Sequence, residues 1–223
     1  MMAPSGGCKI KGSPYMICHD SMEDEKRRYI TAGMMGLCLI LGIIGLLGSS
    51  WLVAYGETTE MKTSLGELSQ ELESAEMCNQ MVSMSGVAEC DGATWVMSWS
   101  EACDVFDDDG DSCAMGTAGT VAKIFLWLGV ILSLFMTIMA VLPMAGIDWM
   151  DSKIPDKIKT ILSWTPGSLI LIGVMLWILI SPNDVTDGYD LGMSAYMAIL
   201  AGLLGLSSTV LDKYEIDVKF TRR

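Results

Sequence analysis

Four long apolar stretches limit the folds open to this chain more than any other feature of its sequence. They are Tyr29–Tyr55, Ala118–Ala145, Thr160–Ile180 and Leu191–Leu211. A helix of about 20 apolar residues crosses the hydrocarbon core of a bilayer, and each stretch reaches or exceeds that length. The sequence therefore predicts four transmembrane helices and not a soluble core.

The basic residues alternate between the segments that connect these stretches. The N-terminal tail has five Lys and Arg residues, the segment after the second stretch three and the C-terminal tail four. The two intervening loops have one and none. Because loops rich in Lys and Arg stay on the cytoplasmic side, we expect both termini in the cytoplasm of a multi-pass cell-membrane protein.

The predicted fold class is all-α and integral to the membrane: a four-helix transmembrane bundle with a disulfide-tied extracytoplasmic loop of mixed helix and short strands. A start at Met22 with signal cleavage at the small residues Gly48-Ser49-Ser50 is an alternative that also leaves this loop outside. The expected segments are a cytoplasmic tail (1–28), helix 1 (29–55), the long outer loop (56–117), helix 2 (118–145), a cytoplasmic loop (146–159), helix 3 (160–181), a short outer loop (182–190), helix 4 (191–211) and a cytoplasmic tail (212–223).

The long outer loop carries the net charge of the protein. It has fourteen Asp and Glu residues and one base, Lys62, so its charge of −13 equals that of the whole chain. This acidity argues against a nucleic-acid partner, which needs a basic face. Spacings of three and four residues predict an amphipathic helix over Glu57–Cys78, and Thr94–Trp99 has the composition of a strand. The apolar residues of the predicted helix are Met61, Leu65, Leu68 and Leu72.

Four cysteines lie in the loop, and an even number in an oxidising compartment indicates two disulfides. They are Cys78, Cys90, Cys103 and Cys113. Three pairings are open. The loop has no Cys-x-x-Cys pair and no histidine, so neither a zinc site nor any other cofactor is predicted.

An acidic turn near the end of the loop contains Asp107, Asp109 and Asp111 around Gly110. Weak binding of divalent cations is one interpretation and a solvated turn is the other, because the spacing of a calcium-binding EF-hand is not met. The tail residues Cys8, Cys18 and His19 supply only three ligands, and a structural zinc site needs four.

The loop has few of the residues that catalysis needs. His19 is the only histidine and lies in the tail, so no Ser/His/Asp or Cys/His set can form at the loop. None of the apolar stretches has Asp, Glu, His or Arg at its centre, which argues against active transport more than against a passive pore. We therefore expect a protein that is not an enzyme.

Small residues spaced for close helix contact recur in the first and fourth stretches. The candidates for helix packing are Gly36, Gly42, Gly45, Ser49, Gly202 and Gly205. They favour contacts within the bundle, with other membrane proteins or with a second copy. Trp51 and Lys123 are the candidate anchors at the outer membrane interface, where Trp and snorkelling Lys side chains gather.

The layout resembles that of claudin-like and peripheral-myelin-protein-like tetraspan membrane proteins. Trp51 resembles a tryptophan of those families, and Lys123 stands where claudins have a basic residue entering the second helix. Gly86–Cys90 followed by Cys103 resembles their Gly-Leu-Trp-x-x-Cys…Cys motif, without its Leu-Trp pair and with two further cysteines. The resemblance implies a left-handed four-helix bundle under a small extracellular β-sheet, and a role in adhesion, barrier formation or as an accessory subunit.

The function that these features favour is structural or interactive. The acidic loop would meet a partner, a cation-rich cell envelope or another copy of the protein. The alternative is a small cation channel or transporter accessory subunit, in which the acidic loop concentrates cations at a pore mouth. A hydrated path through the bundle would separate the two.

Overall fold

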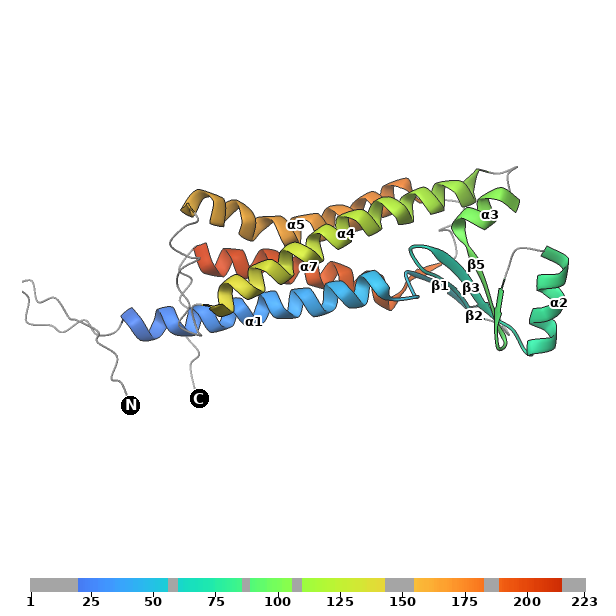
Figure 1. Cartoon of the computed structure of the whole chain (residues 1–223), viewed down its shortest axis with the longest axis horizontal. Helices are drawn as coiled ribbons and strands as arrows, with labels where there is room; N and C mark the ends of the chain where they lie inside the picture. The colour runs from blue at the N-terminus through green and yellow to red at the C-terminus, as the bar shows by residue number, and fades with distance from the viewer. Residues whose placement is uncertain are drawn as a thin grey trace, which may run out of the picture.

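The computed structural model describes residues 20–55, 60–85, 89–105, 110–142, 155–182 and 189–213. Four long helices run side by side as a bundle, and an antiparallel sheet with two short helices lies at one end of it (Figure 1). The long helices are α1 (Asp20–Leu47), α4 (Asp111–Val141), α5 (Asp156–Ile180) and α7 (Met193–Lys213). All four are long and apolar enough to cross a membrane, which confirms that prediction at the level of length and composition.

The bundle is apolar outside as well as inside. Leu126, Ile170 and Trp177 are fully buried in its interior. Large aliphatic side chains also point outward along each helix, and Leu47 and Leu179 remain 70% and 72% exposed. Soluble proteins rarely expose such continuous apolar surface, whereas a lipid environment favours it.

The sheet has six strands in the order β4-β5-β3-β2-β1-β6, and every neighbouring pair is antiparallel. Five strands come from the segment between α1 and α4. The sixth comes from the segment between α5 and α7 and pairs Leu191 with Leu52. The strands are β1 (Leu52–Tyr55), β2 (Glu60–Thr63), β3 (Glu67–Glu71), β4 (Glu89–Asp91), β5 (Thr94–Ser98) and β6 (Asp190–Leu191).

The helix ends differ from those expected. Within the first apolar stretch, helix α1 ends at Leu47, and strand β1 begins five residues later at Leu52. Gly48 and the two serines that follow are weak helix formers, so the helix stops there and the remaining apolar residues join the sheet. The second long helix begins at Asp111, seven residues before the expected Ala118, so it projects beyond the membrane-spanning length into the sheet domain.

The prediction of a helix over Glu57–Cys78 is wrong, because the described part of that range contains β2 and β3. Ser64 starts the turn between them: its hydroxyl oxygen accepts hydrogen bonds from the backbone N–H groups of Gly66 at 3.1 Å and Glu67 at 2.9 Å. Ladder pairing on both sides of β3 then outweighs the helical spacing of the leucines. The predicted strand at Thr94–Trp99 is confirmed as β5, with Trp99 starting helix α3 (Trp99–Val105).

Candidate functional site

One face of the sheet is covered. By register, Leu52, Thr63, Leu68 and Met97 lie side by side across four strands on this face. Thr63 and Met97 are each 1% exposed. Helices α2 (Ala75–Ser85) and α3, with the first turns of α4, contribute to the same hydrophobic core. The covered face of the sheet and the interior of the bundle therefore form one continuous hydrophobic core.

The opposite face is predominantly acidic, although Lys62 of β2 also lies on it, paired with Ser69 of β3. Alternation along the strands places Glu67 and Glu71 of β3 on one face with Glu89 and Asp91 of β4 and Asp190 of β6. All five carboxylate side chains are exposed. We call these five residues the acidic face. Thr94 pairs with both Glu71 and Asp91, so two carboxylates flank one strand position.

Short acidic strands protect the two edges of the sheet. The edge strand β4 has three residues, two of them acids, and the edge strand β6 has two residues, one of them Asp190. Short, charged edges discourage the addition of further strands from another chain.

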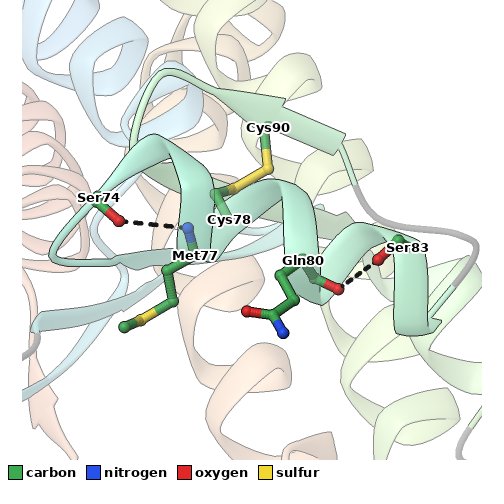
Figure 2. The surroundings of a disulfide bond; sticks show 6 residues. All are labelled: Ser74, Met77, Cys78, Gln80, Ser83 and Cys90. Carbon is green, nitrogen blue, oxygen red and sulfur yellow. Dashed lines mark hydrogen bonds between the residues drawn. A yellow bond between two sulfur atoms is a disulfide. The ribbon is translucent and has the colours of Figure 1, made fainter.

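A disulfide between Cys78 and Cys90 holds α2 against the covered side of β4 (Figure 2). Their Cα atoms are 6.0 Å apart, and Cys78 is fully buried. Ser74 caps the helix, since its hydroxyl oxygen accepts a hydrogen bond from the N–H of Met77 at 3.3 Å. The disulfide fixes the position of α2, which lies farther from the bundle than the sheet does (Figure 1).

A second disulfide joins Cys103 of α3 to Cys113 in the first turn of α4, with Cα atoms 4.6 Å apart. Both predicted disulfides are thus present, and the structure selects one of the three pairings. A capping box begins α3: the Ser98 N–H and hydroxyl both donate to the Glu101 carboxylate, at 3.0 and 2.7 Å. These bonds, the one from the Ser98 hydroxyl first, lower the pKa of Glu101 below its ordinary value.

Trp51 ties the sheet to the bundle. It is fully buried, so the prediction of an interface anchor is wrong for this residue. Its indole N–H donates to the Gly45 carbonyl in the last turn of α1 at 2.8 Å. Its own backbone N–H donates to Thr63 of β2 at 2.6 Å, and its carbonyl accepts from the N–H of Gly192, just before α7, at 2.8 Å.

The turn between β2 and β3 lies on the outer part of α4. The Leu65 carbonyl packs against Gly119, where any side chain would collide with it. A side chain at Gly66 would collide in the same way with the ammonium group of Lys123. Trp99 also donates to the Ser64 carbonyl at 3.2 Å. Lys123 therefore lies at the boundary between the sheet and the bundle.

Most of the predicted packing residues lie at close helix contacts. These are Gly42, Gly45, Gly202 and Gly205. A Cβ at Gly45 would lie only 2.8 Å from the Cβ of Ala198 in α7. The remaining two candidates do not pack in this way: a Cβ at Gly36 would meet nothing within 4 Å, and Ser49 is exposed beyond the end of α1.

The cation candidates are only partly within the described residues. Asp107 and Asp109 lie outside them, while Asp111 is the first residue of α4 and is half-buried. Among the residues that the structure describes, no group of three or more His, Cys, Asp or Glu side chains could hold a metal. The tail residues Cys8, Cys18 and His19 lie outside the described range.

No protein-family model matches the sequence, and no curated protein matches it significantly. In the motif that carries the claudin-like resemblance, Gly86–Ala88 lies outside the described residues. Cys90 and Cys103 bond to different partners and not to each other. What the fold and site define is a class: four helices able to cross a membrane, joined at one end to an acidic sheet domain closed by two disulfides.

Proposed function

We propose that the protein is a multi-pass membrane protein that presents its acidic sheet domain outside the cell for adhesion, envelope organisation or partner binding. Both termini would be cytoplasmic. The start of α1 and the end of α7 lie at the end of the bundle away from the sheet (Figure 1). The tails and the segment between α4 and α5 together carry twelve of the fourteen bases, which supports this orientation.

The acidic face is the observation that carries the proposal. Its five exposed carboxylates come from three strands whose positions are fixed by ladder pairing, two disulfides and the buried Trp51. A rigid surface loses little conformational entropy when a partner binds. Its charge favours a basic partner surface or a layer of cations, and raises the rate of encounter with either.

The packing of the bundle favours this function over the channel alternative. At several glycine positions along the bundle, neighbouring helices pack so closely that no side chain would fit between them. A Cβ at Gly129 would lie 2.6 Å from Ile170 Cγ1, and one at Gly205 would lie 3.0 Å from the Gly167 Cα. Trp177 and Leu126, both 2% exposed or less, fill the interior on the sheet side of these contacts. Interdigitated apolar side chains of this kind leave little room for a hydrated path.

Site-specific photo-crosslinking in intact cells tests the proposed function. A photoreactive amino acid at Ser69, between Glu67 and Glu71, is expected to give a discrete adduct with a partner protein, an envelope component or a second copy. High salt should reduce that adduct, because the attraction is electrostatic. The matched control carries the same group at Gln80, which is exposed on α2.

Replacing Glu71, Glu89 and Asp91 by their amides should abolish the Ser69 adduct. Amide replacement of Glu73, Glu76 and Asp104, three exposed acids outside the acidic face, should leave it unchanged. Equal adducts from Ser69 and Gln80, or a Ser69 adduct that survives neutralisation of the acidic face, would overturn the proposal.

A further inference from the structure

The outer part of α4 carries a cationic and an aromatic side chain one helical turn apart. The Lys123 ammonium lies against Gly66, at the boundary between the sheet and the bundle. Trp127 follows four residues later, about 6 Å further along the helix toward the other end of the bundle. Residues four apart share one side of a helix, and Trp127 is 49% exposed.

The surface below this pair is apolar. Leu128, Ile131 and Leu134 are 47%, 55% and 46% exposed, and they continue the outward side of α4 past Trp127. Lys side chains keep the ammonium in the polar interface while the stem lies on apolar surface. The indole of Trp has an apolar body and one N–H donor, which suits the ester region of a bilayer.

The order of these groups along α4 matches the order of groups along a phospholipid. A phosphate accepts hydrogen bonds from an ammonium group, an ester carbonyl accepts one from an indole N–H, and an acyl chain lies on aliphatic side chains. We propose that Lys123, Trp127 and the apolar side of α4 below them bind one phospholipid in the outer leaflet. The inference rests on the membrane insertion and orientation proposed above.

Confinement in the bilayer favours a lipid over free phosphate as the ligand. The net charge of −13 on residues 56–117 repels a lipid phosphate and a soluble phosphate alike, so charge does not separate the two. A membrane-bound phosphate is already confined to the depth of Lys123, and its acyl chains add apolar contact that inorganic phosphate lacks. The attraction is local because salt screens charges beyond roughly 8 Å.

The test uses the full chain purified in detergent and delipidated. Added dioleoyl phosphatidylglycerol should raise its melting temperature and give a one-lipid adduct by native mass spectrometry. A glycolipid with the same acyl chains and no phosphate, and inorganic phosphate alone, should do neither. These measurements do not depend on which side of the membrane the domain faces, so they are separate from the crosslinking test of the proposed function.

Lys123→Met keeps the apolar stem and removes the charge. It should lower lipid affinity roughly tenfold, the usual effect of losing one charge-assisted hydrogen bond. Trp127→Leu should lower the affinity as well, whereas Lys123→Arg should retain it and shows that the fold tolerates a change at this position. Lys62→Met removes the same charge from the sheet and is the matched control.

Three results would overturn the inference. The first is equal lipid retention by the wild type and Lys123→Met. The second is equal loss of retention in Lys62→Met, which would indicate a general charge effect. The third is stabilisation by the glycolipid or by inorganic phosphate equal to that by the phospholipid.

Discussion

Trp51 and Trp177 contact each other edge to face, with ring centroids 5.0 Å apart and planes at 65°. Trp51 precedes the first strand of the sheet and Trp177 lies in the last turns of α5, so the pair joins the sheet domain to the bundle. Both rings are 2% exposed or less. With the indole hydrogen bond to Gly45, this contact explains how a small sheet keeps a fixed position on four long helices.

Replacing Trp51 should destabilise the protein more than replacing any exposed side chain. Trp51→Ala removes a buried aromatic ring and a buried hydrogen bond, and should cost about 3–5 kcal/mol of unfolding free energy. Trp51→Phe keeps most of the packing and should cost less. Thermal unfolding in detergent measures both, with Leu179→Ala as a control at a side chain that is 72% exposed. A Trp51→Ala variant as stable as the control would contradict the role of Trp51 in joining the sheet domain to the bundle.

Adding a methyl group at Gly45 should disrupt the contact between α1 and α7. The new Cβ would lie 2.8 Å from Ala198 Cβ and 2.9 Å from its backbone nitrogen, so the helices must move apart. Overpacking of this kind costs about 1–3 kcal/mol. Gly33→Ala is the matched control because a Cβ there meets nothing within 4 Å. Unfolding measurements that rank the two variants equally would refute this contact.

Removing the bond between Cys78 and Cys90 should release α2 while the sheet persists. The loop that it closes has a sequence separation of 12 residues, and a bridge of this size contributes about 3 kcal/mol. Hydrogen exchange of the double serine variant should show fast exchange in α2 and slow exchange in β3 and β5. Replacing Cys103 and Cys113 by serine should instead give fast hydrogen exchange in α3. Loss of protection throughout the sheet in the first variant would contradict this account.

The start of α3 should weaken in acid. Hydrogen bonds from Ser98 lower the pKa of Glu101, so the capping box stabilises the fold above the unfolded-state pKa of Glu101. That stability is lost over the pH range that runs from the ordinary Glu pKa of about 4.3 down through the lower, folded-state pKa of Glu101. Denaturation midpoints over this range should fall less steeply in Glu101→Gln than in the wild type. Parallel curves for the two proteins would be evidence against the capping box.

The elements predicted from the sequence are those set by local composition. Four apolar stretches specify four helices because each holds enough apolar residues to cross a bilayer, and the β-branched and aromatic composition of Thr94–Ser98 specifies a strand. The number of disulfides followed from four cysteines in one loop. Their pairing did not, because it depends on β4 placing Cys90 next to α2.

The failures have a common cause in contacts between distant segments. Leu65 and Leu68 fit a helical spacing, yet Leu65 packs on α4 from a turn while Leu68 lies on the covered face of the sheet. Trp51 is buried by contacts from α5 and from the residues before α7, more than 120 positions along the chain. A pattern read over ten or twenty residues contains no information on such partners. Ser64 and Gly66 were the local signal for the turn.

Labelling of a single added cysteine, Gln80→Cys, tests most directly whether the acidic sheet domain lies outside the cell and both tails lie inside. Gln80 is exposed on α2, beyond the sheet. A membrane-impermeant maleimide applied to intact cells should label this cysteine and leave the native Cys8 and Cys18 unlabelled until the cells are lysed. Labelling of the tail cysteines in intact cells, with Gln80→Cys labelled only after lysis, would contradict the account.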